Sequence, residues 1–212
     1  MSRLRLILVR HGETHLNRDG RIQGINDTSL DEVGRSQAQA VARALSRDLP
    51  FQLYASPIAR ARETAQIISE TLGVPSSTVA ELREADAGEL EGLTGAEMRE
   101  RYPEFAERWA EDSGTAQMPG GESLAEVQDR AWQALGRIAE AHGEDTVVVV
   151  SHNFVIQTVV CRVLEAPLKH SRRLRQDLGS ITRLDLSGSQ WTVASLNETA
   201  HLEPPTPMVP AQ

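Results

Sequence analysis

Three adjacent residues near the N-terminus have the chemistry of a phosphate site. Arg10, His11 and Gly12 directly follow Leu6–Val9, a short apolar run that predicts a buried strand. Arginine offers a planar fork of donors suited to phosphate, histidine can attack or transfer protons near neutral pH, and glycine lets a ligand approach the backbone. Because ligands of open α/β sheets bind beyond the carboxyl ends of the strands, the triplet predicts a phosphoryl site.

A second histidine follows a second predicted strand. Thr146–Val150 is apolar and rich in β-branched residues, and Ser151, His152 and Asn153 come directly after it. His152 therefore leaves a buried strand in the same way as His11. The two imidazoles can meet at one edge of a sheet.

Five segments, in this order along the chain, resemble the motifs of the histidine phosphatase superfamily, which has the phosphoglycerate-mutase-like fold. They are LVRHGET with Asn17 after it, SPIARARETA from Ser56, LREADAGELEG from Leu82, GGES from Gly120 and VVSHN from Val149. The resemblance implies a three-layer α/β/α fold with a mostly parallel central sheet and a small helical cap. We expect one domain over residues 1–202, a cap insertion at about residues 92–121 and a proline-rich tail over residues 203–212.

The same resemblance implies the catalytic roles. His11 matches the family's nucleophile, whose ring nitrogen would take the phosphoryl group, and Glu84 matches its proton donor, with Asp86 as a rival two residues on. In the family pattern RAxxT the arginine before the alanine binds phosphate, so Arg60 is preferred to Arg62. The predicted catalytic residues are His11, Glu84, His152, Arg10 and Arg60.

A long polar loop over residues 12–30 is expected to line the phosphate site. Asn17 is its strongest candidate because the family pattern RHGETxxN has asparagine there. The predicted substrate-binding residues are Arg10, Asn17, Gln23, Gly24, Arg60, Glu84, His152 and Asn153. In the basic segment KHSRRLR, one of Arg172, Arg173 or Arg175 could reach the site and bind a substrate carboxylate.

The resemblance predicts a metal-independent phosphatase that hydrolyses small phosphate monoesters through a phosphohistidine, without a cofactor. A cofactor-dependent phosphoglycerate mutase is the first alternative. Mutases of the family carry a basic insertion after the acid, whereas Ala85, Asp86 and Ala87 follow Glu84 here and Thr94–Asp112 is rich in glutamate. A non-catalytic phospho-ligand binding module is the second alternative, and it would not require a nucleophile and an acid.

No metal site is predicted. The run from His11 to His15 superficially resembles a zincin motif, but Gly12 stands where that motif needs glutamate.

Composition and charge limit the classes of partner that the chain is expected to bind. The chain has 212 residues and a formal net charge of −8, which disfavours binding to nucleic acid. No apolar run approaches the roughly 20 residues needed to cross a bilayer, and the N-terminus does not read as a secretory signal, so we expect a cytoplasmic protein without membrane contact. The single cysteine, Cys161, lies in an apolar run and is expected to be buried. An exposed hairpin formed by Ile181–Leu186 and Gln190–Leu196 leaves a homodimer open.

Local signals predict the remaining elements. We expect a strand over Phe51–Ala55, a helix capped by Ser56, a strand over Thr78–Leu82 and a buried helix over Asn153–Leu164. Asp31 and Ser123 are expected to begin two further amphipathic helices.

Overall fold

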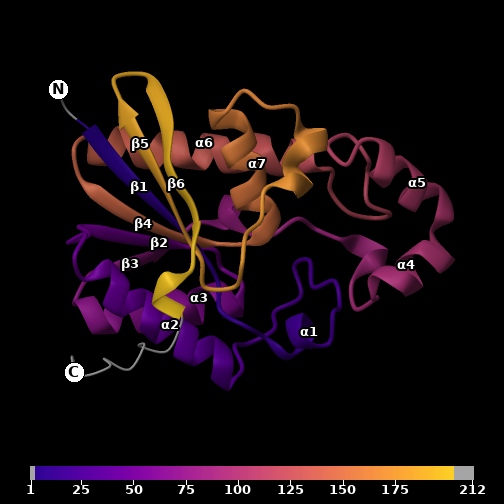
Figure 1. Ribbon diagram of the computed structural model, residues 1–212, viewed down its shortest axis with the longest axis horizontal. Helices are drawn as coiled ribbons and strands as arrows, with labels where there is room; N and C mark the ends of the chain where they lie inside the picture. Colours follow the sequence, from indigo (N-terminus) through magenta and orange to yellow (C-terminus); the bar gives the residue numbers. More distant parts are fainter. Residues whose placement is uncertain (1–2, 203–212) are drawn as a thin grey trace, which may run out of the picture.

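The computed structural model describes residues 3–202, so the predicted tail at 203–212 lies outside the described residues. Six strands form one sheet in the order β3-β2-β4-β1-β5-β6 (Figure 1). The strands are β1 (Arg3–Arg10), β2 (Gln52–Ala55), β3 (Ser76–Thr78), β4 (Thr146–Ser151), β5 (Ile181–Ser187) and β6 (Gln190–Glu198). The α-helices are α1 (His15–Arg18), α2 (Glu32–Leu45), α3 (Ala59–Leu72), α4 (Gly95–Arg101), α5 (Pro103–Glu111), α6 (Leu124–His142) and α7 (Asn153–Val163). Short 3₁₀ helices are η1 (Ala80–Leu82), η2 (Gly88–Leu90), η3 (Leu168–Arg173) and η4 (Ala200–Leu202).

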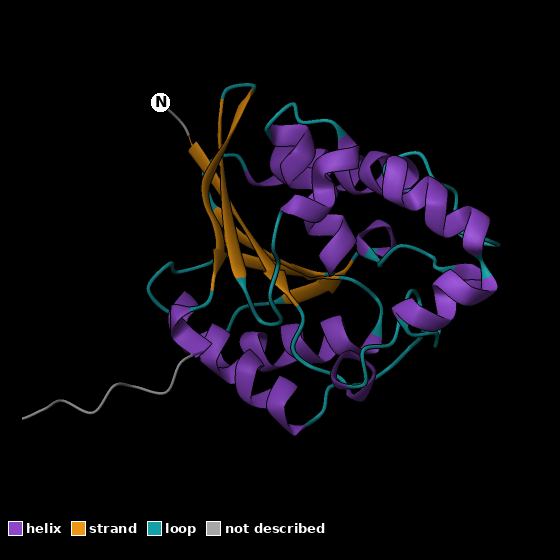
Figure 2. Ribbon diagram, turned by 45° about the vertical axis from the view of Figure 1, so that its right-hand side comes forward, coloured by secondary structure: helices purple, strands orange, loops and turns teal. Residues whose placement is uncertain are grey.

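The sheet is mostly parallel, as predicted. Strands β1, β2, β3 and β4 run parallel to one another, whereas β5 is antiparallel to β1 and β6 is antiparallel to β5. The last two strands form the expected hairpin at the edge of the sheet (Figure 2). The predicted α/β fold class is confirmed.

Helices cover both faces of the sheet. Helices α2 and α3 lie on one face, and α6 and α7 lie on the other (Figure 1). Side chains alternate between these layers because successive residues of a strand point to opposite faces. In β1, Ile7 and Val9 belong to the core on the α2–α3 side, while Leu6 and Leu8 belong to the core on the α6–α7 side. Burial on both faces explains why this strand is continuously apolar.

Strand pairing brings three carboxyl ends to one edge of the sheet. Arg10 of β1 is opposite Ser151 of β4, and Ala55 of β2 is opposite Val150 of β4. Because these strands are parallel, the residues after them, among them His11 and His152, lie next to one another. The register therefore makes a site from segments that are far apart in the sequence.

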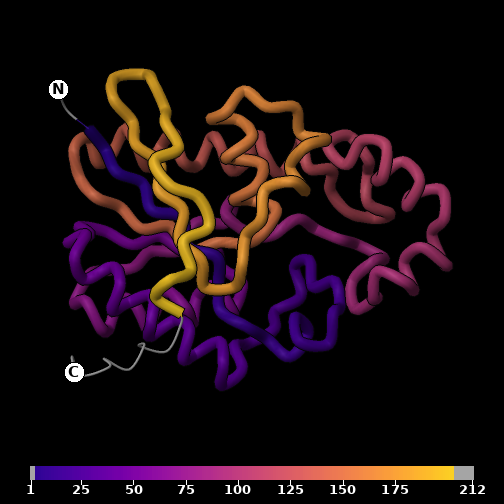
Figure 3. Tube along the Cα trace, viewed as in Figure 1, coloured from indigo at the N-terminus to yellow at the C-terminus, as the bar shows by residue number. Residues whose placement is uncertain are grey.

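Helices α4 and α5 project beyond the sheet at this edge (Figure 3). Both belong to the predicted cap. Thr94 and Glu97 form a reciprocal capping box at the start of α4, and Pro103 occupies the first turn of α5, where its missing N–H costs nothing. Arg21 forms an isolated β-bridge with Thr94, which connects the loop after β1 to the cap.

Several local predictions are confirmed. Asp31 caps α2 through a hydrogen bond from the Gly34 N–H, and Ser123 caps α6 through one from the Glu126 N–H. Cys161 is buried in α7. Among residues 3–202, no helix combines the length and apolar character needed to cross a membrane.

Three local predictions are wrong. Strand β3 ends at Thr78, and the next residues form η1 in place of a continued strand. Ser56 does not cap α3, which begins at Ala59, because the Ser56 hydroxyl accepts from the Ile58 N–H and faces His152. The long loop after β1 contains a helical turn, α1, closed by a capping box between Thr14 and Asn17.

The loop after β1 packs on the start of α2 with no space for a side chain. A Cβ atom built on Gly34 would lie 2.1 Å from the Glu13 carbonyl oxygen, and one on Gly12 would lie 2.4 Å from the Gly34 carbonyl oxygen. Backbone atoms cannot yield as a flexible side chain can. We predict that Gly34→Ala lowers the free energy of unfolding by about 1–3 kcal/mol, as overpacking does.

Gly136 in α6 is the matched control because a Cβ there meets nothing within 4 Å. Gly136→Ala should leave stability unchanged or raise it by up to about 1 kcal/mol, as expected for alanine in a helix. Urea unfolding of both variants measures the difference. Equal stability of the two variants would contradict close packing at Gly34.

Candidate active site

The two histidines predicted to meet do so. The ring centroids of His11 and His152 are 5.1 Å apart. His11 is 2% exposed and His152 is fully buried, so both rings belong to the interior of the protein. Each follows the carboxyl end of a parallel strand, as its position in the sequence predicts.

The hydrogen bonds of His11 define its tautomer. Nδ1 lies 2.7 Å from the Gly12 carbonyl oxygen, which can only accept, so Nδ1 carries the proton. Nε2 then keeps its lone pair, and the Arg60 Nε–H donates to it at 3.2 Å. Burial and the charges of Arg60 and Arg10 hold the pKa of His11 well below its usual value. The ring is therefore neutral and nucleophilic at Nε2.

Arg60 forms the floor of the site. Its side chain is 1% exposed, and its two terminal nitrogens donate to the carbonyl oxygens of Asn26 and Gly24 at 2.8 Å each. Burial lowers the pKa of Arg60 to about 10, against the opposing charge of Glu84, so the guanidinium stays protonated at neutral pH. The backbone of the loop thus holds a cation against the imidazole of His11.

Two buried nitrogens at the site have no hydrogen-bond partner among the described residues. Arg10 donates through Nη1 to the Gln176 carbonyl at 2.5 Å, but its Nε is unpaired. His152 contacts the Ser56 hydroxyl through Nε2 at 2.7 Å, and its Nδ1 is unpaired. Burial and the charge of Arg60 hold the pKa of His152 well below its usual value. Since buried polar groups are normally satisfied, these nitrogens are suited to a polar ligand.

Glu84 provides a buried carboxyl beside these groups. Its two oxygens accept from the N–H groups of Ala85 at 3.0 Å and Phe154 at 3.3 Å. Burial raises the pKa of Glu84, while these hydrogen bonds and the charges of Arg60 and Arg10 oppose the rise. A raised pKa favours the protonated form that an acid catalyst needs.

A pocket of about 410 Å³ opens onto this cluster. The predicted site residues that line it are Arg10, His11, Asn17, Gln23, Gly24, Arg60, Glu84 and Asn153. His152 does not line the pocket but packs against the ring of His11. The amide oxygens of Asn17 and Gln23 both contact Thr14, so these two residues also brace the loop.

The alternative candidates are placed differently. The carboxylate of Asp86 accepts from the Gly88 N–H and does not line the pocket, whereas Glu84 does. Arg62 is exposed and contacts the Pro57 carbonyl. Of the basic segment, Arg172 lines the pocket, while Arg173 does not and Arg175 pairs with Asp177.

Two further findings concern other parts of the surface. A larger pocket, of about 770 Å³, lies beside Trp132 and Trp191 and contains none of the predicted site residues. Within residues 3–202, no three His, Cys, Asp or Glu side chains gather as a metal site.

An ion pair that was not predicted from the sequence holds the loop of Glu84. Arg130 of α6 pairs with both carboxylate oxygens of Glu122 at 2.9 Å and donates to the carbonyl oxygens of Glu81, Arg83 and Glu84 at 2.6 to 2.9 Å. Glu122 in turn accepts from the Asp86 N–H at 3.0 Å. Glu122 belongs to the GGES motif, which was the available signal, but nothing near Arg130 in the sequence indicated its role.

We predict that Arg130→Ala misplaces Glu84. Turnover of an alkyl phosphate should fall about 10- to 100-fold, because positioning errors near 1 Å have costs of that size. Turnover of p-nitrophenyl phosphate should fall less, since its leaving group departs without a proton. Arg137→Ala removes an exposed arginine from the same helix and is the control. Equal losses on both esters, at an equal folded fraction, would contradict a positioning role.

Comparison with known proteins identifies the family. Residues 6–199 match the model of the histidine phosphatase superfamily, branch 1. The chain is 35% identical to phosphoserine phosphatase 1 of Hydrogenobacter thermophilus over 94% of each chain. Two Arabidopsis thaliana relatives are a metal-independent phosphoserine phosphatase, at 34% identity over 93% of this chain and 82% of that one, and phosphoglycerate mutase-like protein 4, at 35% identity over 93% and 86%.

A solved structure has the same fold. The mycobacterial glucosyl-3-phosphoglycerate phosphatase in complex with VO₃ superimposes with a TM-score of 0.83 at 30% identity, over 92% of this chain and 99% of that one. The predicted resemblance and the predicted phosphoric monoester hydrolase are confirmed. The chain belongs to the histidine phosphatase superfamily.

Proposed function

We propose that this protein is a metal-independent phosphatase that hydrolyses small phosphate monoesters through a phosphohistidine formed on His11. The observation that carries the proposal is the geometry of that ring. Its Nδ1 proton is bound to the Gly12 carbonyl, and its Nε2 lone pair lies beside the Arg60 guanidinium at the base of the pocket. A nucleophile and a cation that can bind phosphate thus share one buried position.

The phosphate dianion would be held first. Arg10 and Arg60 would donate charge-assisted hydrogen bonds to its oxygens. Asn17 and Asn153, which line the pocket, would complete the binding groups. His152, whose ring packs against that of His11, would support the nucleophile. Because these groups are fixed by the fold, they would stabilise charge that develops on the phosphoryl oxygens in the transition state.

The reaction would proceed in two displacements. His11 Nε2 forms a bond to phosphorus as the ester P–O bond breaks, and the protonated carboxyl of Glu84 gives its proton to the leaving oxygen. Water then attacks phosphorus, the ionised Glu84 takes a proton from it, and the N–P bond breaks. The products are the alcohol and inorganic phosphate, and both side chains return to their starting states. None of these steps requires a metal ion.

The names of the relatives suggest the first substrates to try. Phosphoserine and glucosyl-3-phosphoglycerate are both small phosphate monoesters. A phosphoglycerate mutase would instead return the phosphoryl group to a hydroxyl, and a binding module would have no use for a nucleophile beside an acid. The phosphatase names among relatives and the presence of both His11 and Glu84 in the lining of one pocket favour hydrolysis.

Three further proposals rest on sequence features. A single domain over residues 1–202, a cytoplasmic location and a homodimer remain predictions. For the last, β6 is an edge strand that could pair with a second copy. Light scattering with and without a charged residue introduced in β6 tests the dimer.

We predict that His11→Ala lowers phosphate release from a panel of phosphate monoesters by at least about 10³-fold, the scale seen when a nucleophile is removed. His15→Ala is the matched control, since His15 is exposed and lies outside the pocket. Chelator should not change wild-type turnover. Quenching in alkaline detergent during turnover should trap a phosphoryl group that is stable in base and lost in acid on wild type, and none on His11→Ala.

Three outcomes would contradict the proposal. Interconversion of 2- and 3-phosphoglycerate, primed by the bisphosphate and without phosphate release, would indicate a mutase. Binding of phosphate esters without turnover would indicate a binding module. Loss of activity with chelator would indicate a metal-dependent enzyme.

The pKa shifts predict a bell-shaped pH profile. His11 acts as the neutral ring, so kcat/KM, which reports the free enzyme, rises with pH through its lowered pKa and is already near its plateau below the usual histidine range. Glu84 acts as the protonated carboxyl, so kcat/KM falls as pH rises through its raised pKa. With Glu84→Gln the alkaline fall should disappear for p-nitrophenyl phosphate. An unchanged alkaline limb in that variant would assign the acid to another group.

A further inference from the structure

Beyond its phosphate end, the pocket has an apolar wall. Helix α5 contributes Phe105 and Trp109, α7 contributes Phe154, and η2 contributes Leu90. The Trp109 ring lies 5.5 Å from Phe105 and 5.7 Å from Phe154, centroid to centroid, so the three rings form one continuous surface. Such a surface favours an apolar body over a small polar one.

The pocket also holds more positive charge than one phosphate group needs. Its five arginines are Arg10, Arg21, Arg60, Arg99 and Arg172, and its one carboxylate is Glu84. Arg10 and Arg60 lie at the phosphate end beside His11. Arg21 is already engaged, because its Nη1 lies 3.2 Å from Glu97 and 2.7 Å from the Gly92 carbonyl. Two of the five guanidiniums therefore remain without an assigned role.

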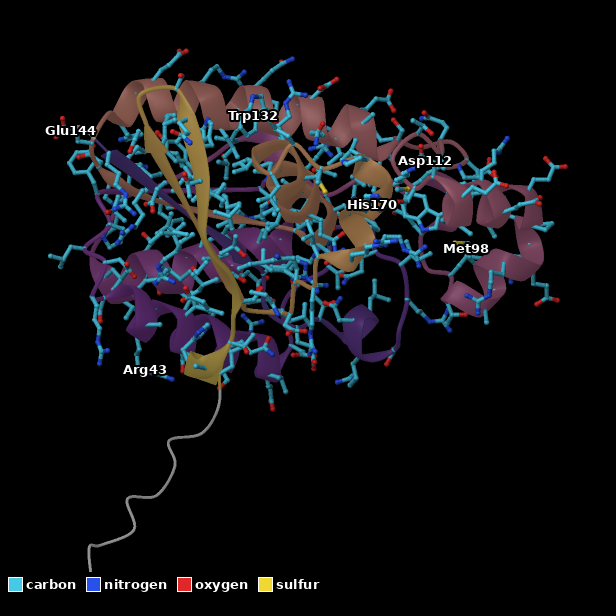
Figure 4. All side chains as sticks on the ribbon, turned by 45° about the horizontal axis from the view of Figure 1, so that its top comes forward. Arg43, Met98, Asp112, Trp132, Glu144 and His170 are labelled. Atoms are coloured by element: carbon cyan, nitrogen blue, oxygen red, sulfur yellow. The ribbon has the colours of Figure 1, made fainter. Side chains whose placement is uncertain are left out.

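Arg99 and Arg172 are those two. Both are exposed at the pocket, and among residues 3–202 no carboxylate lies within 4 Å of either guanidinium. They come from two distant segments of the chain, α4 of the cap and η3 after α7. Figure 4 shows Met98 of α4 and His170 of η3 in the same half of the molecule. Solvated arginines are common, but two of them lining one pocket from separate elements can bind one anion together.

We propose, on the basis of the function proposed above, that the substrate is a phosphate monoester whose apolar body carries a carboxylate, and that Arg172, with Arg99, binds this carboxylate. The phosphate occupies the end formed by Arg10, His11 and Arg60. The body lies against the aromatic wall. The carboxylate reaches the rim, where a guanidinium can bind both of its oxygens.

Matched esters test this proposal. Benzyl phosphate supplies the apolar body alone. Its para and meta derivatives carry either a carboxylate or a carboxamide on the ring, and the two derivatives at one position differ mainly in charge. The substituent is remote from the leaving oxygen. We expect wild type to hydrolyse a carboxylate form with a kcat/KM about two- to fivefold above that of the carboxamide, the range for exposed charged pairs. The higher kcat/KM of the carboxylate form should come from a lower KM, and the difference between the two forms should shrink at high salt.

Variants assign the effect to residues. Arg172→Gln should bring the carboxylate-to-carboxamide ratio of kcat/KM to about one, and Arg99→Gln should reduce that ratio. Arg173→Gln and Arg101→Gln are the matched controls, because both side chains are exposed on the same elements and neither lines the pocket. Ethyl phosphate tests the apolar body and should be hydrolysed less efficiently than benzyl phosphate.

The outcomes separate this inference from the proposed function. Hydrolysis of the carboxylate and carboxamide forms with equal kcat/KM would overturn the inference and leave the phosphatase intact. A ratio that changes equally in Arg172→Gln and Arg173→Gln would also overturn it, because the effect would then be one of general charge. Failure of wild type to release phosphate from any of the esters would overturn both proposals.

Discussion

The contact between Arg60 and His11 is the interaction on which the site depends. A guanidinium that is 1% exposed would be costly to bury alone, but three of its nitrogens have partners in Gly24, Asn26 and the His11 ring. Backbone carbonyls supply partial negative charge without a carboxylate that would neutralise the cation. Arg60 therefore keeps a positive charge that a phosphate dianion can share. Burial, together with the charges of Arg60 and Arg10, lowers the pKa of His11 and keeps the ring neutral.

The same burial acts in opposite directions on the two groups proposed to do the chemistry. It lowers the pKa of the His11 imidazole and raises that of the Glu84 carboxyl, because it disfavours the charged form of each. Both groups are thus biased toward the neutral state in which one attacks and the other donates. Two arginines moderate the rise at Glu84, so a carboxylate remains accessible for the second displacement. The Arg130–Glu122 ion pair holds the backbone of Glu84 in place.

Much of the fold could be predicted from the sequence because it depends on local signals. The runs Leu6–Val9 and Thr146–Val150 have apolar side chains on both faces, which is typical of central parallel strands, and Asp31 caps its helix through an adjacent turn. The strand expected over Thr78–Leu82 is wrong because its end forms a 3₁₀ helix over Ala80–Leu82, in which Leu82 is buried. Periodicity over five residues does not separate these two outcomes.

The site residues that belong to sequence motifs could be predicted, whereas the residues that act through tertiary contacts could not. His11, Arg60 and Glu84 were assigned by resemblance, and the structure places them around one pocket. Ser56 looked like a helix cap, since serine before proline satisfies that local rule, but its hydroxyl instead contacts His152. Arg130 lies eight residues after Glu122, in the amphipathic helix α6. Only the packing of α6 against η1 shows that Arg130 holds the loop of Glu84.

The distribution of charge connects the fold to the ligand. The whole chain carries a formal charge of −8, yet five arginines and a single carboxylate line the pocket. An acidic surface repels anions in general, whereas a cleft lined by cations attracts them locally, and low-dielectric walls concentrate that field. The aromatic rings of Phe105, Trp109 and Phe154 are such walls. An anionic ester is therefore attracted to the pocket that contains His11. The residues between the phosphate end and the rim of this pocket then decide selectivity.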